Sequence, residues 1–236
     1  MNAATAGDDA ATEAAFLLGR LVVVPDHSGA LWLPEERTLV VADLHLEKGS
    51  SYARRGVFLP PYDSAATLAA LAAAIARHAP ARIIALGDSF HDREAGERFG
   101  ASERATLAAL QAGRDWIWVT GNHDPQIGGG LGGEVVARLS LAGVTLRHEP
   151  DAAEAGFEIA GHLHPAAKLR LRGRALRRRC FALSARRCVM PAMGAYAGGL
   201  NLRDAAFGPL LGAGYSAHLL GDARLFRIDP RLLLPD

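Results

Sequence analysis

Five short polar motifs, each placed directly after an apolar run, occur along this chain in one order. They are Asp43-Leu44-His45, Gly87-Asp88, Gly121-Asn122-His123-Asp124, an isolated His148, and Gly161-His162-Leu163-His164. A short apolar run that ends in a polar motif is typical of a buried strand, and the carboxyl ends of such strands are where α/β sheets bind ligands. The pattern therefore limits the chain to folds that bring several strand ends together.

The composition is that of a globular chain and indicates no charged or membrane partner. The chain has 236 residues, half of them apolar, and a formal net charge of +1, which suits one compact domain over residues 1–236. No apolar stretch approaches the roughly 18 residues of a membrane span. Residues 1–15 are rich in Ala, Asp, Thr and Glu, so we expect a flexible tail and no secretory signal. Cys180 and Cys188 are too few for a disulfide framework, so we expect buried thiols in a reducing cytoplasm.

Strand-like and helix-like runs alternate in the first half of the chain. The predicted elements are a hairpin of 21–24 and 31–33, strands at 38–42, 82–86 and 116–120, helices at about 64–78 and 102–112, a short helix at 134–139, a loop at 49–61 and a flexible glycine-rich turn at 128–133. Asp63 or Ser64 can cap the first helix and Ser102 the second.

The second half consists mostly of predicted strands, at 144–147, 157–160, 167–172, 176–183, 188–191 and 218–228. One half alone cannot cover both faces of a sheet. We therefore expect an α/β protein in which two sheets pack face to face and helices flank them.

The motifs have the donor types of a metal centre. Residues two apart on a strand point to the same side, so Asp43 and His45 can reach one ion, and so can His162 and His164. Gly87 precedes a candidate ligand where a missing Cβ allows a close approach to metal, and Gly161 does the same. Carboxylate, imidazole and amide donors suit Mn, Fe, Zn or Ni, and they do not suit an all-oxygen calcium site or a thiolate zinc site.

The charge balance of such a centre indicates the reaction class. Asp43 and Asp88 supply two negative charges, whereas two divalent ions supply four positive ones, so the centre stays positive even with a hydroxide between the ions. A positive centre attracts a phosphate ester and stabilises the charge of an in-line transition state. The neutral amide of Asn122 fits this better than a third carboxylate.

The motif order resembles the calcineurin-like metallophosphoesterase superfamily over roughly residues 20–205. The stretches Val40-Val41-Ala42-Asp43-Leu44-His45-Leu46-Glu47-Lys48-Gly49, Leu59-Pro60-Pro61-Tyr62-Asp63, Gly87-Asp88-Ser89-Phe90-His91-Asp92 and Gly194-Ala195-Tyr196-Ala197-Gly198-Gly199-Leu200 look like the ligase-associated DNA-damage-response endonuclease (PdeM) subfamily. The resemblance implies a four-layer α/β/β/α sandwich of two mixed β-sheets flanked by helices. It also implies two divalent ions, with manganese expected and iron, zinc or nickel as alternatives.

The resemblance further implies a role for each motif residue. The first ion would be held by Asp43, His45 and His164 and the second by Asn122, His148 and His162, with Asp88 bridging them, His123 facing the substrate phosphate and Asp124 accepting the other N–H of His123. The nucleophile would be a hydroxide that bridges the ions, so no covalent intermediate is expected. The superfamily often has an acid three residues after the Gly-Asp aspartate, whereas here that position is His91 and the acid is Asp92.

Several basic side chains could contact the substrate. Lys168, Arg170, Arg172, Arg174, Arg177, Arg178 and Arg179 surround Gly173, which turns the chain. This run predicts a basic β-ribbon that is either a track for phosphates or a solvated sheet face. Arg54 and Arg55 could contact a second phosphate or the leaving group, or belong to a surface loop. His91 is either a contact of the substrate or ligands or a polar residue at a helix end.

Three functions remain to be compared. The first is a manganese-dependent phosphodiesterase, a cytoplasmic DNA-repair endonuclease associated with a DNA ligase, a helicase and an exonuclease, as the resemblance implies. The second is a small-molecule phosphatase or phosphodiesterase acting on nucleotides or cyclic nucleotides. The third is a scaffold that kept the fold and lost catalysis, which is disfavoured because all seven expected ligands and His123 are present. The oligomeric state and the DNA structure preferred are not indicated.

Overall fold

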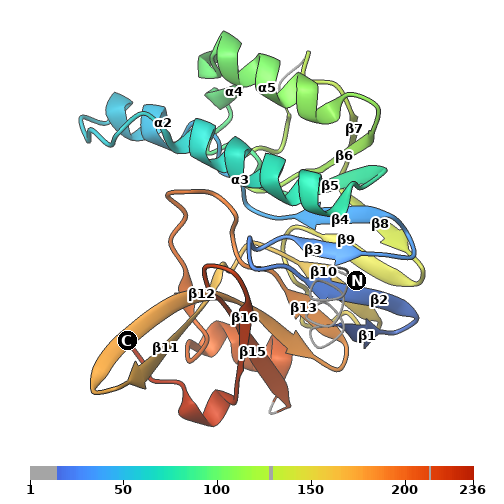
Figure 1. The fold of residues 1–236 in the computed structure, drawn as a ribbon, viewed down its shortest axis with the longest axis vertical. Coiled ribbons are helices and arrows are strands. Elements are labelled where there is room, and N and C mark those ends of the chain that lie inside the picture. Colours follow the sequence, from blue (N-terminus) through green and yellow to red (C-terminus); the bar gives the residue numbers. More distant parts are fainter. Residues whose placement is uncertain (1–14, 128–129, 213) are drawn as a thin grey trace, which may run out of the picture.

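Two β-sheets pack face to face in this protein, and the longer helices lie on the outside of the first sheet (Figure 1). The computed structural model describes residues 15–127, 130–212 and 214–236. The expected tail, apart from Ala15, and residues 128–129 of the expected glycine-rich turn lie outside this described part. Within it, no helix is long and apolar enough to cross a membrane.

The first sheet is mixed, and its parallel half carries three of the polar motifs. Its strands, in spatial order, are β1 (Phe16–Leu18), β2 (Leu21–Pro25), β3 (Leu31–Leu33), β4 (Thr38–Val41), β5 (Arg82–Leu86), β6 (Asp115–Val119) and β7 (Glu134–Val136). Strands β1 to β4 pair antiparallel, whereas β4 to β7 are parallel. Because β4, β5 and β6 run in the same direction, they end at one edge, shortly before Asp43, Asp88 and Asn122.

The helices connect these parallel strands and cover one face of the first sheet. They are α2 (Lys48–Arg54), α3 (Asp63–His78), α4 (Ala95–Arg98) and α5 (Ala101–Gln111). Helix α3 forms from an Ala- and Leu-rich run and ends at Ala79, which is left-handed and precedes Pro80. Its Leu68, Leu71 and Ile75 share one face and are buried in the core beside the sheet. Burying each of these side chains stabilises the fold by about 2 kcal/mol.

The second sheet is also mixed and carries the other two motifs. Its strands run in the order β14 (Leu200–Asn201), β11 (Pro165–Leu171), β12 (Arg174–Ser184), β13 (Arg187–Val189), β10 (Phe157–Ala160), β9 (Val144–Arg147) and β8 (Arg138–Leu141), while β15 (Tyr215–Leu220) pairs with both β12 and β16 (Leu225–Ile228). Strands β9 and β10 are parallel, so they end side by side before His148 and His162. Short turns of helix, η1 (Ala205–Phe207), α6 (Gly208–Leu211) and η2 (Pro230–Leu232), cover its outer face in the described residues.

Alternate residues of the central strands face opposite layers, which explains the unbroken apolar runs of the sequence. In β5, Ile83 and Ala85 pack against the helices, whereas Ile84 and Leu86 pack against the second sheet. In β12, Phe181 faces the first sheet. A strand buried on both faces is apolar throughout. The expected sandwich of two mixed sheets flanked by helices is confirmed, with a thin outermost layer of short helices on the second sheet.

Three local predictions were wrong. Residues 134–139, expected as a helix, form β7 and the start of β8, because β-branched Val135 and Val136 extend the first sheet beside β6. The expected loop 49–61 contains most of α2. The expected strand 218–228 is a hairpin of β15 and β16, because Gly221 and the residues after it turn the chain.

The expected helix caps are also wrong, and the same side chains serve the segment that follows His45. Neither α3 nor α5 has a side-chain cap, so Ser102 caps nothing. Asp63 instead accepts the N–H of Gly49 at 3.0 Å, and the hydroxyl of Ser64 accepts the N–H of Glu47 at 2.8 Å. These bonds fasten the start of α2 to α3.

A buried carboxylate joins the turn between β2 and β3 to the end of α3. Asp26 accepts two hydrogen bonds from Arg77, at 2.9 and 3.1 Å, and lies 2.8 Å from Nε2 of His78. It also accepts the N–H of Ser28 at 2.8 Å. Burial opposes ionisation of Asp26, but the hydrogen bonds from His78, Ser28 and Arg77 outweigh it and hold its pKa well below the usual range.

Replacing Asp26 with Asn should lower the free energy of unfolding by about 2 kcal/mol near neutral pH, because charge-assisted hydrogen bonds become weaker neutral ones. The folded-state pKa of Asp26 is depressed, so its contribution is complete above its unfolded-state pKa of about 3.9 and is lost as the pH falls below that value. Urea unfolding of both proteins at about pH 6 and about pH 3 measures this. A difference between them that did not shrink at the lower pH would contradict the explanation.

Candidate metal centre

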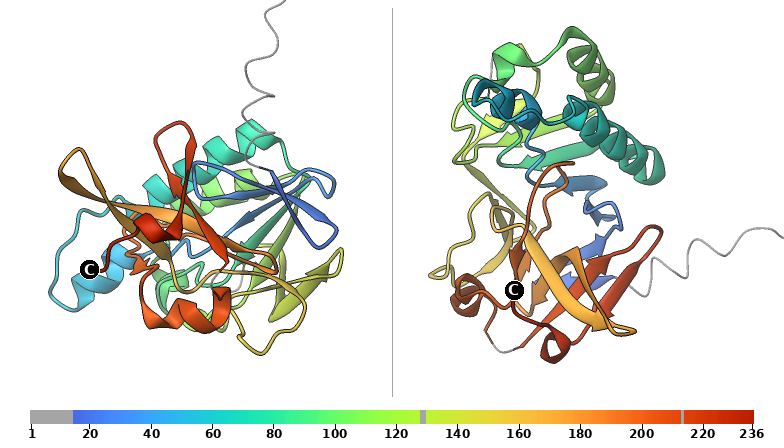
Figure 2. Two further views of the ribbon diagram at one scale, coloured as in Figure 1. Left: turned by 90° about the horizontal axis from the view of Figure 1, so that it is seen from below. Right: turned by 90° about the vertical axis from the view of Figure 1, so that its left-hand side faces the viewer.

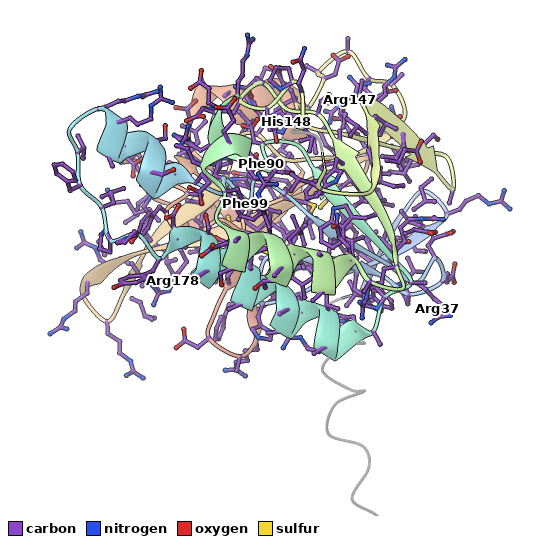
Figure 3. All side chains as sticks on the ribbon, turned by 90° about the horizontal axis from the view of Figure 1, so that it is seen from above. Arg37, Phe90, Phe99, Arg147, His148 and Arg178 are labelled. Atoms are coloured by element: carbon purple, nitrogen blue, oxygen red, sulfur yellow. The ribbon has the colours of Figure 1, made fainter. Side chains whose placement is uncertain are left out.

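Five loops bring the polar motifs together at the edge where the two sheets meet. Three follow β4, β5 and β6 of the first sheet, and two follow β9 and β10 of the second. Backbone hydrogen bonds join neighbouring loops, since the N–H of Asp43 donates to the carbonyl of Gly87 at 3.2 Å and that of Gly161 to the carbonyl of His148 at 2.9 Å. The side chain of His148 lies well inside the outline of the molecule (Figure 3).

One group of donor atoms comes from Asp43, His45 and His164. One donor atom of each lies within 4.8 Å of the others. The Nε2 atoms of His45 and His164 are 3.2 Å apart, and Nε2 of His164 is also 3.2 Å from Oδ1 of Asp43. Asp43 is fully buried and His45 nearly so. These are the three residues expected to hold the first ion.

The second group consists of Asp88, His148 and His162, again within 4.8 Å of one another. Nε2 of His148 lies 3.1 Å from Nδ1 of His162, 3.4 Å from Oδ2 of Asp88 and 2.9 Å from Oδ1 of Asn122. Its Nδ1 lies 3.7 Å from Oδ1 of Asp43, so the two groups adjoin. All seven expected ligand residues therefore come together, and the bridging role of Asp88 stays a prediction.

The donor atoms are spaced as ligands of an ion would be. Two nitrogens that each lie about 2.1 Å from one ion, at an angle of about 90–110°, are about 3.0–3.4 Å apart. The facing ring nitrogens of the two histidine pairs have this spacing, at 3.2 and 3.1 Å. Oδ1 of Asp43 is buried without a hydrogen-bond partner among the described residues, which is costly unless a cation compensates it. The residues therefore fit a pair of divalent cations, and their donor types do not decide which metal.

Burial and the carboxylates shift the pKa values of the imidazoles in opposite directions. Burial opposes the charged form of His148, but the carboxylates of Asp88 and Asp43 outweigh it and raise the pKa of His148 to about 9. Burial, followed by the charge of His164, lowers the pKa of His45, so its ring is neutral and keeps a lone pair for a cation. Cations bound beside Asp43 and Asp88 would take the place of the His148 proton.

The candidate ligands lie on strained backbone, not on extended strands. Asp43, His45, Asp88, His162 and His164 all have positive φ, between 42° and 68°. A side chain other than glycine loses roughly 1–2 kcal/mol in this left-handed conformation. The expectation that residues two apart can reach one ion agrees with the grouping of Asp43 and His45, although these residues do not lie on an extended strand. It was wrong for His162 and His164, whose donor atoms belong to different groups. Left-handed residues alternate with Leu44 and Leu163 in tight loops beyond the strand ends, which turns both ligands of each motif inward.

The glycines in the motifs make room for other ligands and not for metal. A Cβ on Gly87 would lie 2.3 Å from the ring of His148, and one on Gly161 would lie 2.5 Å from Oδ2 of Asp43. Each glycine therefore allows a ligand from a different loop to pass over its backbone. From the sequence we expected the space at these two glycines to admit a metal, whereas the groups next to them are the side chains of His148 and Asp43.

His123 lies at the mouth of the centre with a side chain that is 40% exposed. Its Nδ1 is 2.8 Å from the carbonyl oxygen of His91, and its Nε2 is 3.9 Å from Oδ2 of Asp88. A carbonyl can only accept, so Nδ1 carries the proton and Nε2 is left facing the donor groups. This placement suits the expected role opposite a bound phosphate.

The prediction that Asp124 orients His123 by accepting its N–H was wrong, because the backbone carbonyl of His91 accepts that hydrogen bond. Asp124 is buried and instead accepts the backbone N–H groups of Phe90 and Gly121, at 3.0 and 3.1 Å. Burial raises its pKa to about 6. Asp124 therefore joins the loops after β5 and β6 and positions His123 only indirectly.

His91 belongs to the lining of the centre. Its ring stacks on that of His123 with 5.2 Å between centroids, and its Nδ1 lies 3.4 Å from Nδ1 of His45. The centroid of the Tyr52 ring lies 5.8 Å from that of the His91 ring, and the ammonium of Lys48 lies 5.9 Å from the centroid of the Tyr52 ring. Sequence reasoning missed Lys48 and Tyr52. Their position in the segment that directly follows the candidate ligand His45 could have indicated that they line the centre.

The arginines proposed as substrate contacts lie in different surroundings. Arg54, at the end of α2, pairs with Glu94 at 2.8 Å on the surface. Arg55 is exposed, and its charge helps to lower the pKa of His91 after burial and the charges of Lys48 and His123. Arg170 is exposed on β11, and Arg172 lies in the following turn with φ of 48°. Asp92, whose role was open, pairs with Arg98 at 2.7 Å.

The segment after β13 supports the first group of ligands. The N–H of Met193 donates to Ala42 and that of Gly194 to Asp43, at 2.9 and 3.1 Å. The guanidinium of Arg179 donates to three successive carbonyls of this segment, those of Ala192, Met193 and Gly194, at 2.7, 3.3 and 3.2 Å. Sequence reasoning placed Arg179 in the basic run and missed this anchoring role, because it depends on a partner far along the chain.

Replacing His162 with Gly should give a metal-free protein about 1 kcal/mol more stable than the corresponding His162→Ala protein, because only glycine relieves the left-handed strain. Urea unfolding of the two variants in chelator measures the difference. The control is the same pair at Ser102, an exposed position in α5, where glycine should be about 1 kcal/mol less stable than alanine. Equal stability of the two His162 variants would contradict the assignment of strain.

Comparisons with known proteins agree with this geometry. The calcineurin-like phosphoesterase family model matches residues 36–170, more than half of the chain. No curated protein matches. Among solved structures, the crystal structure of Pseudomonas putida nuclease MPE aligns with a TM-score of 0.69 and 26% sequence identity, covering 90% of this chain and 98% of that one. The chain therefore belongs to the calcineurin-like phosphoesterase family and is a metal-dependent phosphoesterase.

Proposed function

We propose that this protein is a manganese-dependent phosphodiesterase that hydrolyses polynucleotide backbones, as an endonuclease in cytoplasmic DNA repair. The observation that carries the proposal is the pair of adjoining donor groups, Asp43, His45 and His164 beside Asp88, His148 and His162. The similarity to a nuclease supports a polynucleotide substrate. The repair role rests on the sequence resemblance to the ligase-associated endonucleases.

The protein residues and the bound ions would divide the work. When bound, the two ions would acidify a water molecule and bear the negative charge that develops on the phosphoryl oxygens. Asp43 and Asp88 contribute only two negative charges, so the site favours an anionic ester. Asn122 adds a neutral oxygen donor beside His148, at 2.9 Å. His45 is nearly buried, and its imidazole and that of His164 present donor nitrogens 3.2 Å apart.

His123 would provide the proton that the departing oxygen needs. Its Nδ1–H donates to the carbonyl of His91, so a proton carried on Nε2 would point toward the donor groups. The carboxylate of Asp88 lies 3.9 Å from this Nε2 atom. Stacking on His91 fixes the ring plane. This placement supports a role for His123 at the leaving group rather than in the attack on phosphorus.

Replacing His123 with Ala should lower kcat for bis-p-nitrophenyl phosphate by about 10²–10⁴-fold and leave the bound metal content unchanged, because the residue is opposite the substrate and not in either donor group. Steady-state kinetics and elemental analysis of the same preparations measure both quantities. The matched control is His27→Ala, at a histidine in the turn between β2 and β3, which should leave kcat unchanged. A His123→Ala enzyme with full activity would refute the assigned role.

Removal of metal should abolish hydrolysis, and manganese should restore it at about two ions per chain. Manganese should also raise the melting temperature of the protein, because it binds the folded state only. Titration calorimetry, metal analysis and thermal melts check these outcomes, with Asp88→Asn expected to lower the number of bound ions. Restoration of full activity by a single ion per chain would contradict the paired arrangement.

A further inference from the structure

The hairpin of β11 and β12 extends beyond the second sheet as a two-stranded ribbon. Strand β12 pairs with β15 only from Cys180 to Ser184, whereas Arg174 to Arg179 pair with β11 alone. Strand β11 pairs with β14 only at its first two residues. Figure 1 shows the hairpin reaching out from the lower sheet, on the same side as α2, and the left view of Figure 2 shows its tip projecting from the rest of the molecule. A two-stranded ribbon has little stability of its own.

The ribbon concentrates positive charge in a chain that is otherwise net acidic. Residues 165–184 contain seven basic side chains and no acidic one, while the whole chain has a net charge of only +1. Like charges on paired strands repel each other and destabilise the hairpin. Such a concentration of charge is favourable when a polyanion is bound against it.

The register sorts these charges onto two faces. Lys168 is opposite Arg177, Arg170 is opposite Ala175, and Ala166 is opposite Arg179, so Lys168, Arg170, Arg177 and Arg179 share one face. We call this face the inner face. Arg174, opposite Leu171, and Arg178, opposite Ala167, lie on the other face, called the outer face.

The inner face adjoins the candidate metal centre. Arg179 binds the carbonyls of the segment that holds Asp43, as described above. Arg177 donates to the carbonyl of Gly199 at 2.7 Å. Leu200, which follows Gly199, donates its N–H to the carbonyl of His164 at 3.0 Å. Lys168 follows His164 by four residues, a distance of about 13 Å along a strand. The basic row therefore starts beside a candidate ligand and continues outward along the ribbon.

The outer face has no such relation to the centre. Its apolar residues, Ala167 and Leu169, pack toward the short helices on the far side of the second sheet. Arg178 is exposed, and Figure 3 shows it at the edge of the molecule, well apart from His148. The two faces thus carry similar charge but differ in their direction relative to the centre.

We propose that the inner face binds the phosphate backbone of a polynucleotide strand whose scissile diester lies at the candidate metal centre. This rests on the proposed function and adds to it the surface that makes a long strand a better substrate than a small diester. Residues 165–179 contain no aromatic side chain for stacking on bases, so binding would be independent of sequence. Asp236 lies 3.3 Å from Arg177 and 4.0 Å from Lys168, and its carboxylate partly offsets their charge.

The test compares two double variants that each remove two charges from the same hairpin. Lys168→Gln with Arg170→Gln changes the inner face, and Arg174→Gln with Arg178→Gln changes the outer face. Fluorescence anisotropy of labelled single strands of DNA and of RNA, about 30 nucleotides long, measures binding by the manganese-loaded enzymes over a range of salt concentrations. Hydrolysis of the DNA strand and of bis-p-nitrophenyl phosphate is measured on the same preparations, with thermal melts to verify folding.

The inner-face variant should bind the strand about 10-fold more weakly at physiological salt, and the dependence of log K on log salt should flatten by about 1.4, or about 0.7 per lost phosphate contact. The outer-face variant should change binding less than about 3-fold. Both should hydrolyse the small diester as the wild type does. Asp236→Asn should tighten binding, because it removes an opposing charge.

Equal losses by the two double variants, or unchanged binding by the inner-face variant, would overturn the proposal. Weaker binding of RNA and DNA alike supports recognition of the shared backbone, whereas loss for only one of them would contradict it. Failure of the wild type to hydrolyse the small diester would refute the proposed function instead, and the anisotropy experiment would still decide the role of the ribbon. If the inner-face variant did not fold, Arg170→Gln alone, at an exposed side chain, would replace it.

Discussion

The buried carboxylate of Asp43 is the constraint on which the rest of the centre depends. Its Oδ2 accepts the N–H of His162 at 3.0 Å, its N–H donates to Gly87, and its carbonyl accepts the N–H of Gly194. These bonds join segments from both sheets that are distant in the sequence. A fully buried negative charge is unfavourable unless positive charge compensates it. The remaining oxygen, Oδ1, therefore gives the fold a physical need for a cation at this point.

The donor groups of the centre lie on strained backbone and are held by close contacts between neighbouring loops. Ligand residues from three loops have left-handed backbone, and glycines of neighbouring loops leave only enough space for the side chains of His148 and Asp43. Asp124 joins the loops after β5 and β6 by accepting backbone N–H groups of both. The free energy gained by burying the apolar layer between the sheets offsets the cost of this backbone strain. Donor atoms held in this way have the spacing that two bound metal ions require, so the loops need not rearrange when the ions bind.

Chemistry and substrate capture are assigned to different parts of the same fold. The loops at the strand ends carry the donor groups and His123, which identify a phosphoesterase. The ribbon of β11 and β12 carries charge with no role in the sheet core, and only one of its faces is directed toward the centre. In the proposed arrangement, the ribbon favours binding of long strands, whereas the metal centre does not distinguish phosphate esters by their length. Substitutions of Lys168 or Arg170 can then change substrate preference without disturbing the ligands.

The sequence by itself determined the donor set and the layer order. The runs before Asp43, Asp88 and Asn122 are apolar throughout because their strands are buried on both faces, and that property is local enough to recognise. Tertiary structure alone decided that the carbonyl of His91, and not Asp124, accepts the hydrogen bond from His123, and that Val135 lies in an edge strand instead of a helix. It also decided that Arg179 anchors a loop whereas Arg178 faces outward. These outcomes depend on hydrogen-bond partners and strand neighbours far away in the chain, which local propensity and spacing do not encode.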